Sequence, residues 1–222
     1  MPDSLARRAL VAAGLAALVA VAACDDTGGT TPAIPAAPAA TASAPLPAAF
    51  LLRNDQMPGY GRSNSRVLRP DILATEANDP ALATTLIDQG FLEGAEWTFS
   101  PPQPGAPGRP FGQVVTRATI FRDAAGAGRN VETEKQQSDR APSSGGSITV
   151  VTDLPATGVD SLTVYVAETA NGAVSGQVFL AIMRRGRVVA ELFAGGDPTT
   201  ATEKNFAALL LLAEGRLATA PA

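Results

Sequence analysis

The chain has 222 residues, 17 of them basic and 21 acidic, so its formal net charge is −4 and it lacks the basic surface that nucleic acid binding requires. It contains no histidine and a single cysteine, Cys24. This composition excludes histidine-based acid–base catalysis, most zinc sites and an internal disulfide. An enzyme built from these residues would have to use carboxylates, a serine–lysine pair or a metal bound by oxygen ligands.

The first 24 residues have the layout of an export signal. Arg7 and Arg8 supply a positive start, and residues 9–23 form an apolar run that is shorter than the roughly 20 residues of a membrane-spanning helix. The run ends in the four residues Val21, Ala22, Ala23 and Cys24. An ordinary signal peptide, or a short anchor with an incidental cysteine, is the alternative interpretation of this pattern.

This ending resembles the lipobox of bacterial lipoproteins, in which a peptidase cuts before a cysteine that carries diacylglycerol. The resemblance implies that residues 1–23 are removed and that acyl chains on Cys24 join the protein to the cell membrane. It also implies an extracytoplasmic location, which is periplasmic in a diderm host. An acylated Cys24 has no thiol chemistry left. The paired arginines leave twin-arginine export open as a second route.

Residues 24–49 are expected to form a tether after the lipidated cysteine. Apart from Ile34 and Leu46, the residues that follow Cys24 are small or polar and rich in alanine and proline. Such a segment cannot bury enough apolar surface to offset the entropy of ordering. The composition therefore predicts a disordered, extended tether and a single domain over residues 50–222.

The first part of the domain predicts few regular elements. Residues 50–52 are apolar enough to dock on the core, whereas residues 54–70 are rich in proline, glycine, asparagine and arginine and should be irregular. A short strand is expected at 95–100. The prolines and glycines of residues 101–110 indicate an exposed loop.

One helix is expected between these segments. Asp79 directly before Pro80 is typical of a helix start, and Gly90 is a typical end. The expected inner face consists of Leu82, Leu86 and Ile87.

The segment 113–122 predicts a strand, because apolar and polar residues alternate along it. One of its faces should carry Val115, Arg117 and Thr119, and the other Val114, Thr116, Ala118 and Ile120. A polar helix is expected over 123–139. Its modest inner face would consist of Ala124, Ala127 and Val131.

The second half predicts four strands and a final helix. The strands are expected at 148–152, 161–167, 174–183 and 187–194, and the turn at residues 184–186 indicates a hairpin between the last two. The helix should run over 200–217, with Thr200 and Glu203 as a capping box. Its apolar stripe is Phe206, Leu209, Leu210, Ala213 and Leu217.

Strands joined by short turns predict an α+β fold, in which a mostly antiparallel sheet packs against two or three helices, including the amphipathic C-terminal helix. In residues 113–217, the late hairpin, the break at Gly195, Gly196, Asp197 and Pro198 and the final helix resemble PsbP-like domains. Such domains occur in actinobacterial lipoproteins and in the extracellular sensor domains of some mycobacterial kinases. The resemblance implies an envelope ligand-binding or accessory role and supplies no site residues. Those sensor domains often carry disulfides, which this chain cannot form.

Arginines at the predicted hairpin turn are one candidate contact site. Arg184, Arg185 and Arg187 could together grip a carboxylate or phosphate of an envelope polymer. The alternative is a soluble turn that blocks pairing with another sheet edge.

Aromatic residues near the proline-rich loop are the second candidate. Trp97, Phe99 and Phe111 could line the mouth of a ligand pocket, because aromatics beside loops often contact ligands. Core packing is the alternative for all three.

No catalytic, cofactor or metal site is predicted. Glu93 and Glu96 could share a side, but a general acid–base pair also needs burial and a cleft. Asp153 and Asp160 flank a turn, where aspartate is usually structural, and no calcium-loop spacing is present.

We therefore expect a membrane-anchored, noncatalytic envelope domain that binds a small amphipathic ligand or a protein partner. An envelope hydrolase that uses carboxylates or a serine–lysine pair is one alternative. A purely structural envelope protein is the other.

Overall fold

The computed structural model describes five stretches of the chain: residues 46–103, 108–139, 148–151, 158–171 and 174–219. The predicted signal, Cys24 and most of the predicted tether lie outside the described residues, as do Asp153 and part of the proline-rich loop. Among the described residues, Pro47, which belongs to the predicted tether, is buried.

Within the described residues, seven strands form one antiparallel sheet in the order β1-β2-β3-β7-β6-β5-β4. Two antiparallel meanders, one from each half of the chain, join at its centre through β3 and β7. Together with the helices, this confirms the α+β class. The strands are β1 (Gly61–Leu68), β2 (Phe91–Ser100), β3 (Gln113–Phe121), β4 (Ile148–Val151), β5 (Ser161–Asn171), β6 (Val174–Arg185) and β7 (Val188–Gly196).

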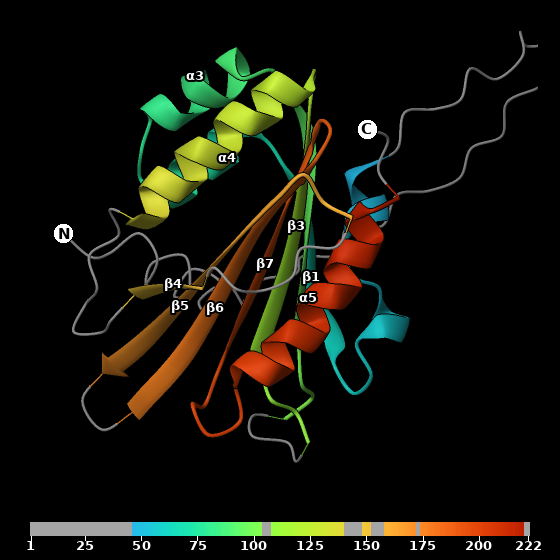
Figure 1. Cartoon of the computed structure of the whole chain (residues 1–222), viewed down its shortest axis with the longest axis vertical. Helices are drawn as coiled ribbons and strands as arrows, with labels where there is room; N and C mark the ends of the chain where they lie inside the picture. The colour runs from blue at the N-terminus through green and yellow to red at the C-terminus, as the bar shows by residue number, and fades with distance from the viewer. Residues whose placement is uncertain (1–45, 104–107, 140–147, 152–157, 172–173, 220–222) are drawn as a thin grey trace, which may run out of the picture.

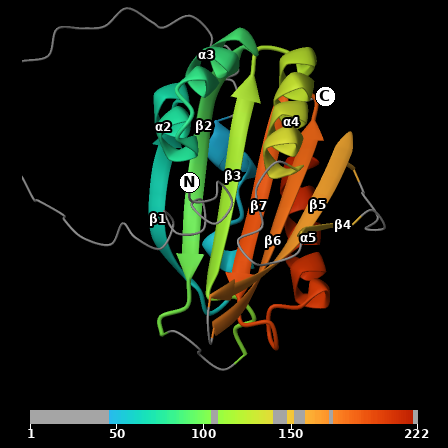
Figure 2. The same ribbon diagram turned by 90° about the vertical axis from the view of Figure 1, so that its left-hand side faces the viewer.

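Helices lie on both faces of the sheet (Figure 1). The 3-10 turn η1 (Pro47–Phe50) and helix α5 (Glu203–Leu217) cover what we call the α5 face; η2 (Asn54–Gln56) follows η1. The other face, the α4 face, is covered at one end by α2 (Pro70–Ala77), α3 (Ala81–Asp88) and α4 (Ala124–Asp139), as Figure 2 shows. None of the described helices is long and apolar enough to cross a membrane.

The α5 face holds the main hydrophobic core. Phe206 of α5 stacks on Phe179 of β6 with ring centres 4.8 Å apart, and Phe111 meets Phe179 edge-on at 6.2 Å. From the other end of the chain, Leu51 and Leu52 are fully buried in the same core, as the apolar run at residues 50–52 predicts. Burial of aromatic and aliphatic side chains from both termini closes this face.

The α4 face has two smaller apolar clusters. Ala127 and Val131 of α4 pack on Phe121, Leu180 and Ile182. Helices α2 and α3 form the other cluster with the end of β1, from Leu68, Leu73, Ala74, Leu82 and Leu86. The alternation predicted for β3 is confirmed, because Val114 and Ala118 face the α5 core while Arg117 lies on the α4 face.

Strand β1 and helix α2 were not predicted. The segment expected to be irregular contains β1, a mostly exposed edge strand whose polar sequence lacks apolar alternation. Helix α2 begins at Pro70, which suits a first helical position, and ends at Asn78 in the left-handed conformation with φ 51°. Strand β2 also begins at Phe91, earlier than residue 95.

The helix ends and inner faces differ in detail from the prediction. Asp79 accepts a hydrogen bond from the Ala81 amide at 3.0 Å, which confirms the start of α3. Ile87 and Ala124, however, are exposed rather than on an inner face. The cap of α5 is Thr202, not Thr200: the Thr202 hydroxyl accepts from the Asn205 amide at 3.4 Å.

Candidate functional site

Four charged side chains of alternating sign cross the α4 face on neighbouring strands. The strand register places Arg66, Glu96, Arg117 and Glu191 next to one another on β1, β2, β3 and β7. Arg66 Nε donates to Glu96 at 2.7 Å, and Arg117 donates to Glu96 through Nη2 at 2.7 Å and through Nε at 3.1 Å. Arg117 Nη1 also lies 3.6 Å from a Glu191 oxygen.

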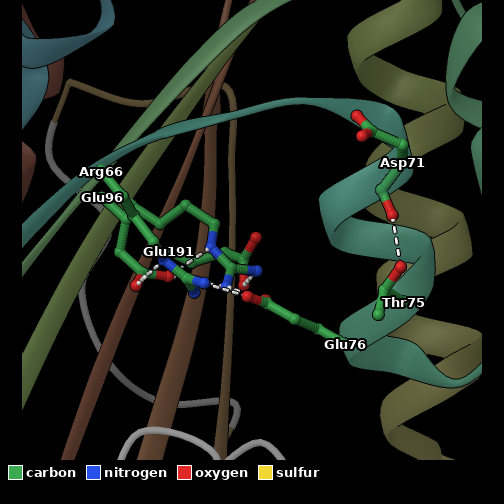
Figure 3. Close-up of polar contacts among 7 residues, drawn as sticks. Arg66, Asp71, Thr75, Glu76, Glu96 and Glu191 are labelled. Carbon is green, nitrogen blue, oxygen red and sulfur yellow. Dashed lines mark hydrogen bonds and ion pairs between the residues drawn. The ribbon is translucent and has the colours of Figure 1, made fainter. Parts of the chain in front are cut away.

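Helix α2 adds a fifth charge to these four. Glu76 in its last turn accepts a hydrogen bond from Arg66 and lies 3.5 Å from Arg117 Nη2. Figure 3 shows Glu76 reaching from the helix toward Arg66 and Glu96 on the sheet. We call Arg66, Glu76, Glu96, Arg117 and Glu191 the charged row.

The charged row is largely removed from water. The Glu96 side chain is 5% exposed and that of Arg117 13%. Burial acts to raise the pKa of Glu96, but the charges and hydrogen bonds of Arg117 and Arg66 outweigh it and hold the pKa below its usual value. Burial acts to lower the pKa of Arg117, but Glu191, Glu96 and Glu76 raise it above the usual value. Both groups are therefore charged at neutral pH.

The charged row does not form a metal site. Among the described residues, no three histidine, cysteine or acidic side chains are placed to hold a metal ion together. The three carboxylates of the row each approach Arg117, so a guanidinium already provides the cation between them.

Beyond the charged row, the α4 face continues past the ends of the described helices (Figure 2). Val115 on β3 pairs with Phe193 on β7. Val115 is two residues from Arg117, and Phe193 is two residues from Glu191. Val178 lies on the next strand, β6. All three side chains are half-buried. Gly195, the register partner of Val178, adds no side chain to cover them. We call Val115, Val178 and Phe193 the open patch.

The open patch lies next to Arg117 and Glu191 of the charged row, whose side chains are each 13% exposed. A sheet face normally buries its apolar side chains against another layer, so this part of the α4 face is covered less completely than the part under the helices. An apolar centre with a few charged groups at its border is typical of binding sites for small molecules and proteins.

The predicted arginines do not form one cluster. Arg184 and Arg185 are consecutive in β6 and point to opposite faces. Arg184 Nη1 lies 3.1 Å from Asp160 Oδ2, whereas Arg185 Nη1 donates to the Gly158 carbonyl at 2.6 Å. Arg187 follows the turn and is half-buried. Their binding of an anionic polymer stays a prediction, but two of the three are already engaged near the hairpin.

Two of the three predicted aromatics are core residues. Phe99 and Phe111 are buried on the α5 face, which agrees with the core-packing alternative. The Tyr60 hydroxyl holds Phe111 by donating to its carbonyl at 3.0 Å and accepting from its amide at 3.1 Å. Trp97 is half-buried, and the guanidinium carbon of Arg62 lies 4.6 Å from its ring centre.

Sequence patterns did not predict the charged row. Glu96 was a candidate together with Glu93, but these residues lie on opposite faces, since Glu93 pairs with Ile120 and Glu96 with Arg117. The available signal was Arg117 within an otherwise apolar and threonine-rich strand, because a charge at such a place needs a partner. The partners come from other strands and from α2, so only the register reveals them.

The chain matches no known protein family and no curated protein sequence. Among solved structures, the extracellular domain of PknH from Mycobacterium tuberculosis is similar to this chain, with a TM-score of 0.48 and 13% sequence identity. The alignment covers 74% of this chain and 93% of that domain.

Proposed function

We propose that this protein is a lipid-anchored, noncatalytic domain on the extracytoplasmic face of the membrane, which binds a small amphipathic ligand or an envelope protein on the open patch. The export signal and its final Cys24 support the anchor. The single observation that carries the binding function is the half-buried open patch beside the charged row.

The state of the carboxylates favours binding over hydrolysis. A general acid must hold a proton near the working pH. Glu96 is instead hydrogen bonded to two arginines, and its pKa is held low. The row can therefore offer fixed charge at the border of the patch, while Phe193 and its neighbours offer apolar contact.

Native mass spectrometry of protein purified from its own envelope tests both parts of the proposal. We expect a mass that lacks residues 1–23 and carries acyl chains, together with a retained ligand or partner. Phe193→Ser should lose that ligand or partner, because it removes the largest apolar side chain of the patch. An unacylated mass would contradict the anchor, and wild-type protein without any retained molecule would contradict binding.

Val67→Ser is the matched control. Val67 is also an apolar strand residue but is 68% exposed and lies on edge strand β1 outside the patch. This variant should retain the ligand or partner. Equal retention by both variants would show that the open patch is not the site. Circular dichroism would confirm that Phe193→Ser is folded.

A further inference from the structure

Helix α5 has an apolar outer surface in addition to its buried one. Phe206, Leu210, Ala213 and Leu217 face the sheet. Side chains three and four residues apart share a helix side, so a second stripe lies opposite. This stripe consists of Ala208, Leu211, Leu212 and Gly215, all exposed, and we call it the outer ridge. Leu211 is 58% exposed and Leu212 38%. Lys204 continues the ridge toward the start of the helix, and none of these residues is acidic.

The described chain begins beside the same helix. Leu46, itself 66% exposed, directly precedes η1. Arg216 of α5 donates through Nε to the Leu51 carbonyl at 3.1 Å and through Nη2 to the Ala49 carbonyl. Figure 1 shows η1 next to α5, on the side of the sheet opposite α4. The segment that leads back to Cys24 therefore joins the domain next to the end of the outer ridge.

The length of that segment limits how far the domain can lie from its anchor. Residues 25–45 separate Cys24 from Leu46. At the roughly 3.1 Å per residue of the extended tether that their composition predicts, this segment reaches at most about 65 Å. Within that reach the tether raises the effective concentration of the domain at the membrane surface, so weak contacts are enough to hold the domain there.

The chemistry of the ridge suits a bilayer better than a second protein copy. A standard protein interface buries about 800 Å² on each partner, and two partly exposed leucines flanked by alanine and glycine provide much less. Helices that lie in the membrane interface present leucine to the acyl boundary and lysine to the head groups. Leu211, Leu212 and Lys204 supply both kinds of residue.

We propose that the outer ridge of α5, together with Leu46, rests on the surface of the membrane that holds the anchor. This inference rests on the proposed lipid anchor. The sheet then lies between the membrane and α4, so the α4 face points away from the bilayer. The open patch is thereby presented to ligands or partners on the outer side.

Site-specific labelling of the lipidated full-length protein tests this orientation. Leu211→Cys and Gln136→Cys would each receive a polarity-sensitive thiol probe in vesicles of phosphatidylethanolamine and phosphatidylglycerol. Gln136 is the matched control, because it is also exposed on a helix but lies on α4 at the opposite face. We expect blue-shifted emission and loss of intensity with nitroxide-labelled lipid at residue 211, and neither change at residue 136.

Each outcome decides the proposal. Equal emission and quenching at the two residues would overturn it. A blue shift at residue 211 that instead depends on protein concentration in detergent would identify a second copy as the occupant, and would also overturn it. Wild-type protein provides the separate check on the anchor: its thiol takes no probe if Cys24 is acylated, and labelling would remove the basis of both proposals. Leu211 is exposed, so its replacement should leave the fold intact.

Discussion

The two faces of the sheet are built from the same strands but are buried by different means. The α5 face packs a continuous apolar core, in which Phe179 contacts both Phe111 and Phe206. The α4 face has two small apolar clusters and the charged row, whose side chains range from 5% exposed at Glu96 to 30% at Arg66, and it leaves the open patch partly exposed. The first face contributes most of the hydrophobic stabilisation, and the second carries the surface that we propose binds a ligand or partner.

The difference indicates a separate purpose for the buried charges. A buried ion pair gains little net stability over apolar residues of similar volume, because removing both charges from water is costly. The order of charges in the charged row is nevertheless specific, because positive and negative side chains alternate across four strands: Arg66, Glu96, Arg117 and Glu191. A slip of one residue in any strand would move its charge to the other face. We therefore expect the row to favour one register rather than to add stability.

Removing the central charge should have the largest effect. Arg117→Met leaves the carboxylates of Glu96, Glu191 and Glu76 without their shared cation. We expect a loss of about 3–5 kcal/mol in the free energy of unfolding at neutral pH, measured by chemical denaturation. The loss should shrink in acid, because protonated carboxyl groups no longer need that cation.

Phe179→Ala is the comparison on the α5 face. It deletes a fully buried ring that stacks on Phe206, so it should also cost about 3–5 kcal/mol. The loss in the free energy of unfolding caused by Phe179→Ala should not shrink in acid. If the losses of both variants changed with pH alike, the two faces would not differ in the way described.

Acid should weaken the α4 face through Glu96. Its pKa is lowered in the folded protein, whereas an unfolded glutamate titrates near about 4.3. The group therefore stabilises the fold above the unfolded value, and this contribution is lost as the pH falls through the folded pKa. The free energy of unfolding of wild-type protein, measured by chemical denaturation, should decrease between about pH 7 and pH 3. In Glu96→Gln this decrease should be smaller, because the contribution of Glu96 is missing.

Glu132→Gln provides the control for the acid measurement. Glu132 lies on α4 and its side chain is 63% exposed. Its replacement should leave the acid dependence of the free energy of unfolding as in wild-type protein. An acid dependence that Glu96→Gln left unchanged would mean that the charged row does not produce it.

The smallest effect is expected at the uncovered edge of the α5 face. Arg62 on β1 lies over Trp97, the only tryptophan of the chain. Arg62→Ala removes an exposed cation–π contact worth about 0.5–1 kcal/mol and should alter the tryptophan fluorescence. Arg53→Ala removes another exposed arginine, paired with Asp55, and should leave the fluorescence unchanged. An unchanged spectrum for Arg62→Ala would show that the contact is not formed in solution.

Sequence patterns predicted the elements that have strong local signals. The alternation in β3, the hairpin of β6 and β7 and the apolar stripe of α5 are all confirmed, because each depends on neighbours close in the chain. Strand β1 was missed because an exposed edge strand needs no apolar alternation. The candidate site was missed for a different reason: its residues come from β1, α2, β2, β3 and β7 and are distant in sequence.

The sequence by itself determined the composition limits, the α+β class and the faces of the strongly alternating strands, and it predicts the export signal. These follow from residue chemistry and from periods of two or about 3.6 residues, which act locally. Only the tertiary structure decided which aromatics are core, that Arg184 and Arg185 diverge, and that Arg117 lies among three carboxylates. These outcomes depend on the pairing of β3 with β7 and on the position of α2. Contacts between residues that are distant in the sequence form only when the strands pair and α2 packs on the sheet.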